Sequence, residues 1–203
     1  RIIVPEKLVE DVKVSLCNLL AKTTIGDPSI DGVKMGSLAG LPQVREITDN
    51  INELAESQEI IYGDLDHFDV KGADKKQGAF IPPILFLNTN PFEKTDCHNI
   101  EAFGPVATIL PYKDLYDAIE LAKMGKGSLV CSIITADDNT AREFTINAAS
   151  MHGRILVLNQ DCAKESTGHG SPMPLLTHGG PGRAGGGEEM GGKRGILHYL
   201  QRT

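Results

Sequence analysis

The sequence lacks any apolar run long enough to cross a bilayer. The longest, such as residues 127–135, fall far short of the roughly 20 residues that a membrane helix needs. No charged and then apolar leader opens the chain, so we expect no membrane partner. Basic residues are in the minority, because 20 Lys and Arg against 27 Asp and Glu leave a formal net charge of -7. That balance repels a phosphate backbone, and nucleic acid is not expected as a partner.

Cysteine is scarce as well. The four cysteines, Cys17, Cys97, Cys131 and Cys162, are widely spaced and form no CxxC pair. The sequence therefore predicts neither a metal site nor a disulfide framework, and a reducing cytoplasm is the default location. Cys17 and Cys131 fall within apolar runs and are expected in the core. Cys97 and Cys162 lie in polar stretches and are weak candidates for a reactive thiol.

What the sequence does contain is an alternation of helical and extended patterns. Apolar residues recur three and four apart over 8–20 and again over 44–54, which predicts two amphipathic helices. Near-continuous apolar runs predict strands, and the last three of them alternate with helical patterns at 112–124 and 137–151. These runs lie at 60–62, 80–87, 106–110, 129–134 and 155–158. The pattern predicts one α/β domain with a mostly parallel sheet and helices on both faces.

Three local features refine this fold prediction. The chain begins with Arg1 in place of methionine, and residues 1–4 already form a strand pattern, so we expect the start to lie inside a larger protein. Pro82 and Pro83 have no N–H to donate, so the strand at 80–87 is expected to start late or to lie at an edge. The polar stretch 64–78 predicts a solvated loop or the tip of a hairpin.

The C-terminal part has little periodicity and is rich in glycine over 179–192. Free backbone N–H groups in such a tract can cradle a phosphate, but Glu188 and Glu189 favour a flexible or closely packed turn. His169 and His178 are either metal or base candidates or packing histidines, and no carboxylate or cysteine stands at ligand spacing to support the former. An apolar pattern returns at Ile196, Leu197, His198, Tyr199 and Leu200, as a short strand or a last helical turn.

The stretch 98–106 carries the most specific arrangement of side chains. Glu101 stands two residues before the ring of Phe103, and Gly104 and Pro105 then lead into a strand. A carboxylate and a ring face at a strand entrance suit a polar, ring-containing ligand. From the chemistry of the residues alone, a turn with a satisfied surface acid is the favoured interpretation.

With these motifs the sequence resembles the aldehyde dehydrogenase family over nearly its whole length. Segments 25–28 with 35–38, 78–86, 101–106 and 153–159 resemble, in order, the family's GDP...MGPL, GxFxxPTxF, EIFGPV and GxVxxN motifs. The glycine tract resembles the family's GGxxxSGxGxExG. Its histidine-glycine variant is similar to family members that oxidise a CoA-linked semialdehyde in phenylacetate catabolism and carry a hydratase domain downstream. The sequence departs from the family at Ile100, where a second acid is common, and at Ala102, where isoleucine is usual.

The resemblance implies a specific place for this chain in a larger enzyme. Residues 1–203 would be a truncated catalytic domain, with the nucleophilic cysteine, the general-base glutamate and the dinucleotide-binding domain upstream of Arg1. None of the four cysteines matches the nucleophile, so no catalytic residue is implied among the 203. By residue matching, Glu101 holds the nicotinamide ribose hydroxyls of NAD or NADP, and Phe103 supports that ribose and ring by packing.

The resemblance also implies a reaction and partners. In the family a thiolate attacks the aldehyde, hydride passes to the nicotinamide, and water releases the carboxylic acid. The implied substrate is an aldehyde, free or CoA-linked, and the isolated chain is expected to be inactive. Residues 160–178 would border the substrate tunnel, and residues 196–200 would join a homo-oligomer. A binding or assembly module with the same fold but no chemistry is the competing interpretation, and a phosphate binder built on the glycine tract is a third.

Overall fold

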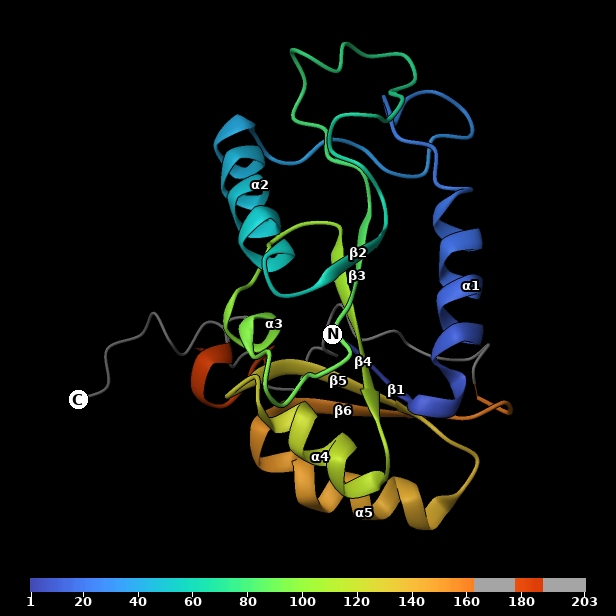
Figure 1. Ribbon diagram of the computed structural model, residues 1–203, viewed down its shortest axis with the longest axis vertical. Coiled ribbons are helices and arrows are strands. Elements are labelled where there is room, and N and C mark those ends of the chain that lie inside the picture. Colours follow the sequence, from blue (N-terminus) through green and yellow to red (C-terminus); the bar gives the residue numbers. More distant parts are fainter. Residues whose placement is uncertain (163–177, 188–203) are drawn as a thin grey trace, which may run out of the picture. The chain divides into compact units, whose positions relative to one another are not determined.

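A computed structural model describes residues 1–162 and 178–187 of the chain (Figure 1). The chain divides into two compact units, Arg1–Lys113 and Asp114–Thr203. Each unit has its own strands and helices. None of the helices within the described residues is long and apolar enough to span a membrane.

The first unit is built on a four-stranded sheet. Its elements are β1 (Ile2–Pro5), the 3-10 helix η1 (Glu6–Leu8), α1 (Val9–Leu20), α2 (Leu41–Ala55), β2 (Glu59–Tyr62), β3 (Ile84–Leu87), α3 (Asp96–Asn99) and β4 (Val106–Tyr112). The strand order is β1-β4-β3-β2. β1, β4 and β3 run parallel, and β2 pairs antiparallel with β3. The predicted α/β fold with a mostly parallel sheet is confirmed.

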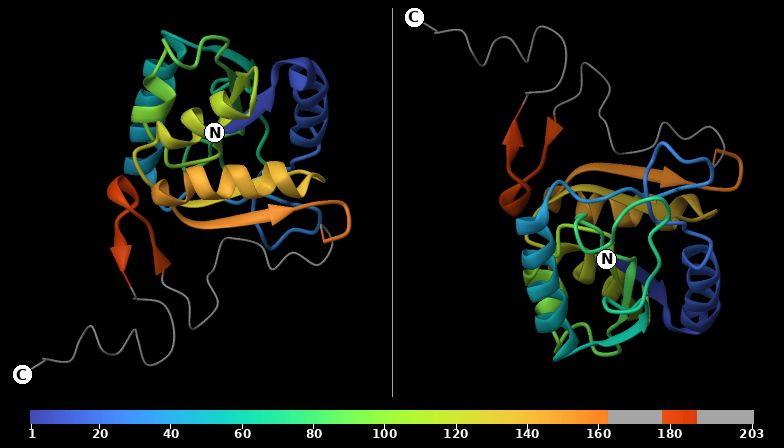
Figure 2. Two further views of the ribbon diagram at one scale, coloured as in Figure 1. Left: turned by 90° about the horizontal axis from the view of Figure 1, so that it is seen from below. Right: turned by 90° about the horizontal axis from the view of Figure 1, so that it is seen from above.

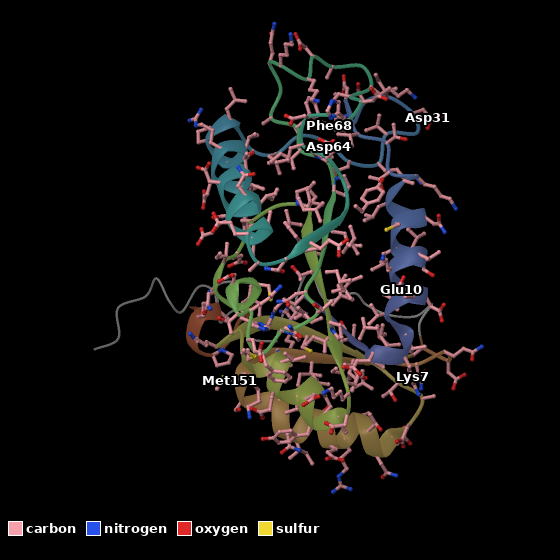
Figure 3. All side chains as sticks on the ribbon, viewed as in Figure 1. Lys7, Glu10, Asp31, Asp64, Phe68 and Met151 are labelled. Carbon is pink, nitrogen blue, oxygen red and sulfur yellow. The ribbon has the colours of Figure 1, made fainter. Side chains whose placement is uncertain are left out.

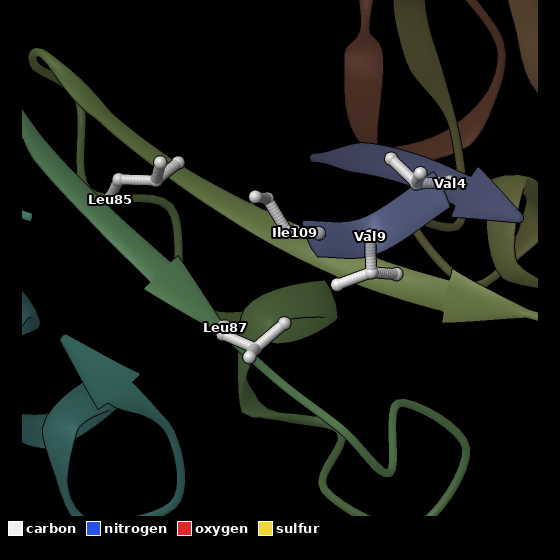
Figure 4. Packing of buried hydrophobic residues seen from close by; sticks show 5 residues of the cluster. All are labelled: Val4, Val9, Leu85, Leu87 and Ile109. Carbon is white, nitrogen blue, oxygen red and sulfur yellow. The ribbon is translucent and has the colours of Figure 1, made fainter. Parts of the chain in front are cut away.

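One face of this sheet packs against α1. The residues Val4, Val9, Leu85, Leu87 and Ile109 form a buried cluster, which Figure 4 shows from close by. Further apolar side chains from α1, among them Val12, Leu16 and Leu20, pack against the cluster at the spacings of three and four that marked this helix in the sequence. Cys17 is half-buried here, in line with its expected place in the core.

The other face of the sheet is covered from the side of α2. Side chains alternate between the two faces of a strand, so the fully buried Phe86 and Leu110 point away from the α1 side. Three residues of one α2 face, Ile47, Ile51 and Leu54, are buried as well. Figures 1 and 2 show α1 and α2 on opposite sides of the strands. The prediction of helices on both faces therefore holds for this sheet.

Proline fixes the start of two elements in this unit. Pro42 stands in the first turn of α2, where its missing N–H costs nothing. β3 begins at Ile84, directly after Pro82 and Pro83, so the late start is confirmed. β3 lies between β4 and β2, however, and is not an edge strand. The loop after β2, which holds Asp64 and Phe68 (Figure 3), contains neither helix nor strand over 64–78, as expected.

The second unit follows a strand–helix–strand plan. Its elements are α4 (Leu115–Lys123), β5 (Ser128–Ile134), α5 (Asp138–Ala148), the 3-10 helix η2 (Ala149–Met151), β6 (His152–Leu158), β7 (His178–Gly179), the 3-10 helix η3 (Gly182–Ala184) and β8 (Gly186–Gly187). β5 and β6 are parallel and joined by α5. Asp114 and Asp137 cap α4 and α5 by accepting backbone N–H groups. The pair β7 and β8 forms a short antiparallel hairpin, red in Figure 2.

The described part of the glycine tract packs tightly against β5 and β6. A Cβ atom on Gly153 would overlap the carbonyl oxygen of Gly179, and one on Gly127 would overlap that of Pro181. Gly127 also has a φ of +121°, which favours glycine. These contacts agree with the closely packed turn that was the favoured interpretation of the tract. Residues 196–200 and most of 160–178 lie outside the described residues.

Candidate functional site

Glu101 and Phe103 lie on a short loop that connects α3 to β4. Both side chains are exposed, and 70% of the Phe103 surface is accessible to solvent. The Phe103 ring therefore lies at the surface of the unit and not in its core. The loop thus carries an exposed acidic residue and an exposed aromatic residue two positions apart.

The backbone of this loop is held by two amide side chains from α2. Gln43 Nε2 donates to the carbonyl oxygen of Phe103 at 2.8 Å, and Asn50 Nδ2 donates to that of Glu101 at 3.2 Å. The orientation of the Gln43 amide is fixed, because its Oε1 accepts from the backbone N–H of Ala39 at 3.0 Å. The two amides are seven residues apart, which places them two turns apart on one face of the helix.

Two further contacts complete the support of the loop. Gly104 lies directly over Ile47, so that a Cβ at Gly104 would stand 2.6 Å from Ile47 Cδ1. The carbonyl oxygen of Pro105 accepts from the backbone N–H of Ile84 at 2.9 Å, which joins the end of the loop to β3. Alternate carbonyls of residues 101, 103 and 105 are therefore all accepting hydrogen bonds from elsewhere in the unit.

A buried histidine stands just before the loop. His98 is 3% exposed; its Nε2 donates to the carbonyl oxygen of Pro91 at 2.9 Å, which leaves Nδ1 to accept from the Arg1 guanidinium at 2.9 Å. Burial is the main cause that lowers the pKa of His98; the hydrogen bond to Pro91 opposes it in part, and the charge of Arg1 lowers the pKa by a smaller amount. The neutral imidazole thereby ties the start of β1 to α3.

The two loop cysteines lie in different surroundings. Cys97, which was expected in a polar loop as a weak candidate for a reactive thiol, is 8% exposed on the inner side of the short helix α3, and its Sγ accepts from Asn88 Nδ2 at 3.5 Å. Burial raises the pKa of the Cys97 thiol, which opposes reactivity. Cys162 is half-buried in the turn after β6, where its Sγ accepts from the Asn159 N–H at 3.3 Å.

A pocket of about 350 Å³ also opens beside the 64–78 loop, with Asp64, His67 and Lys71 among its lining residues. Several polar side chains of this loop form hydrogen bonds within the loop. Asp64 Oδ2 pairs with His67 Nδ1 at 2.9 Å, a hydrogen bond that is the main cause of the lowered pKa of Asp64. The backbone of Lys71 bonds to that of Ile25 and Asp27. These polar groups are thus engaged within the loop and with the segment that follows α1.

Within the described residues no group of three histidine, cysteine or acidic side chains is arranged to hold a metal ion. His178 belongs to strand β7, and His169 lies outside the described residues. The metal-or-base alternative for these two histidines therefore stays untested.

Comparison with known proteins agrees with this architecture. The model of the aldehyde dehydrogenase family matches residues 1–203. Protein MaoC of Klebsiella aerogenes is 49% identical over 83% of this chain and 49% of its own length. The 3,4-dehydroadipyl-CoA semialdehyde dehydrogenase of Aromatoleum evansii is 33% identical over 89% of this chain and 35% of its own length.

The fold is also found in solved structures. The crystal structure of a betaine aldehyde dehydrogenase double mutant from Staphylococcus aureus, in complex with NAD+, superposes with a TM-score of 0.76. That match has 20% identity and covers 99% of this chain and 37% of the other. The chain belongs to the aldehyde dehydrogenase family, and it spans about half or less of the length of these relatives.

Proposed function

We propose that this chain supplies one wall of the cofactor site in an NAD(P)-dependent aldehyde dehydrogenase. Its Glu101 carboxylate accepts the two hydroxyls of the nicotinamide ribose, and the Phe103 ring packs against that ribose and the nicotinamide. The observation that carries the proposal is the pairing of an exposed carboxylate and an exposed ring on a loop whose backbone is held by hydrogen bonds from α2 and β3.

The residues present fit such a cofactor. Ribose hydroxyls are donors, and an ionised carboxylate is an acceptor with room for two of them. The 70% exposed ring of Phe103 offers the apolar face that a sugar or nicotinamide covers on binding. Both groups stand on backbone that is already ordered, so little conformational entropy is lost when the cofactor binds.

In this proposal the 203 residues orient the cofactor, and another segment of the enzyme supplies the groups that react with the aldehyde. Bound NAD or NADP supplies a hydride acceptor, and the nucleophilic cysteine and general base are expected upstream of Arg1. Glu101 fixes the direction in which the ribose, and with it the reacting ring, faces. Hydride transfer depends steeply on such alignment, and a misplacement of about 1 Å can cost on the order of a hundredfold in rate.

The substrate that we propose is a more specific class than aldehydes in general. The relative from Aromatoleum evansii carries the name of a CoA semialdehyde dehydrogenase, which supports a CoA-linked semialdehyde of aromatic-acid catabolism as substrate in place of a free aldehyde. We also propose that residues 196–200 join a second copy in a homo-oligomer and that the enzyme works in the cytoplasm. A binding or assembly module without chemistry is the alternative that the following experiment separates.

We expect Glu101→Gln in the full-length enzyme to slow hydride transfer by roughly a hundredfold while weakening cofactor binding far less. The amide is a poorer acceptor and cannot receive two hydroxyl groups equally, so the ribose loses its orientation more than its affinity. Single-turnover NAD(P)H formation gives the first quantity, and a fluorescence titration with NAD(P)H gives the second.

Glu93→Gln is the matched control, because Glu93 is another exposed acid of the same unit, in the turn after β3. This variant should match the parent in both measurements. If Glu101→Gln also matched the parent, Glu101 would be a solvated surface acid and the proposed cofactor role would fail.

A further inference from the structure

The geometry assigns Asn50 as a positioning residue that, together with Gln43, sets the place of the Glu101 carboxylate and the Phe103 ring through their backbone. This inference rests on the proposed function of Glu101. It concerns residues on α2, more than fifty positions away in the sequence from the loop they hold.

The two amides act on the backbone of residues 101 and 103 and not on the side chains. Each donates to a carbonyl oxygen, at residue 101 and at residue 103. Gln43 and Asn50 are two turns apart on α2, so a single helix face reaches both carbonyls. The carboxylate of Glu101 and the ring of Phe103 remain exposed while the chain that carries them is fixed.

The helix that carries these amides is itself rigidly placed. Ile47, which lies between Gln43 and Asn50 on the same face, is fully buried, as is the neighbouring Ile51 at 1% exposure. Ile47 also contacts Gly104 in the loop. Ile47 fixes α2 in the core, and Gln43 and Asn50 on either side of it hold the loop. The position of the helix therefore determines the position of the loop.

Asn50 is the better residue for a test, because its amide reaches the backbone of Glu101 itself. Asn50→Leu keeps nearly the same shape and removes the donor, so the Glu101 carbonyl loses its fixed partner and the loop can shift. Asn52→Leu is the matched control: the same substitution on the same helix, at an exposed position.

The first measurement uses the 203-residue chain without any cofactor. Hydrogen exchange of the loop amides, including those of Gly104 and Val106, which bond within the loop at 2.7 Å each, should quicken roughly tenfold in Asn50→Leu. It should stay unchanged in Asn52→Leu. Unchanged exchange in Asn50→Leu would overturn the inference.

The second measurement uses the full-length enzyme. Asn50→Leu should slow single-turnover hydride transfer roughly tenfold, with the dissociation constant of NAD(P)H changed less than about threefold. The effect should shrink to less than about twofold when Glu101→Gln is also present, because there is no longer a carboxylate to position. A purely structural loss would instead lower the rate by the same factor in both backgrounds, and that result would overturn the positioning role.

The outcomes separate this inference from the function on which it rests. If hydride transfer is slowed in Glu101→Gln but matches the parent in Asn50→Leu, the positioning role of Asn50 is excluded and the proposed function of Glu101 is retained. If Glu101→Gln transfers hydride at the rate of the parent, both the proposed cofactor role of Glu101 and the positioning role of Asn50 are excluded. If Asn50→Leu does not fold, Asn50→Asp keeps the side-chain size and replaces the donor by an acceptor that repels the carbonyl, and the same two measurements apply.

Discussion

The 203-residue chain, supplied with an aldehyde and either NAD or NADP, is expected to form no NAD(P)H above a buffer control. Loss of a covalent nucleophile normally costs several orders of magnitude in rate. Cys97 is buried, with a raised pKa, and the half-buried Cys162 thiol accepts a hydrogen bond from the Asn159 N–H within its own turn, so neither loop cysteine is expected to replace the nucleophile proposed upstream of Arg1.

Spectrophotometry at 340 nm over hours makes this test sensitive. The matched comparison is the same chain extended upstream to include the proposed nucleophile and cofactor domain, which should turn over. NAD(P)H formation by the 203-residue chain that disappears on thiol alkylation would show that one of its own cysteines is the nucleophile, contrary to the proposal.

Phe86→Ala is expected to reduce the free energy of unfolding of the first unit by about 3 to 5 kcal/mol. The ring is 0% exposed in β3, an interior strand of the sheet, so its removal leaves a cavity that the strands on either side cannot close. Such a loss is a large share of the stability of an ordinary domain.

Phe92→Ala is the control, since this ring is 45% exposed in the turn that follows β3. It should cost less than about 1 kcal/mol. Urea unfolding followed by circular dichroism compares the two variants, with hydrogen exchange of β3 and β4 amides to assign the loss to the first unit. Equal destabilisation by both substitutions would contradict the described packing of the sheet.

Features that depend on neighbouring residues in the sequence were predictable. The apolar spacing of α1 and α2 and the late start of β3 after two prolines follow from helix periodicity and from the missing proline N–H. That Glu101 and Phe103 share one short segment was also evident, because residues two positions apart are close in space without any information on the tertiary structure. The antiparallel direction of β2 was not, since an apolar run has the same composition in either direction.

Features that depend on distant residues could not be predicted from the pattern. The hydrogen bonds from Gln43 and Asn50 to the loop join positions 60 and 51 residues apart, and Arg1 meets His98 across 97 residues. The burial of Cys97 could not be predicted for a related reason. A four-residue helix such as α3 has too few residues to show a helical period, so the sequence does not indicate which of its sides is buried.

The most direct test of the central claim is a crystal structure of the full-length enzyme with NAD or NADP bound. We expect both carboxylate oxygens of Glu101, or one shared oxygen, to lie about 2.5 to 3.0 Å from the two hydroxyls of the nicotinamide ribose, with the Phe103 ring against the sugar or the nicotinamide. A well-ordered cofactor whose ribose is held by other residues, with Glu101 facing solvent, would contradict it.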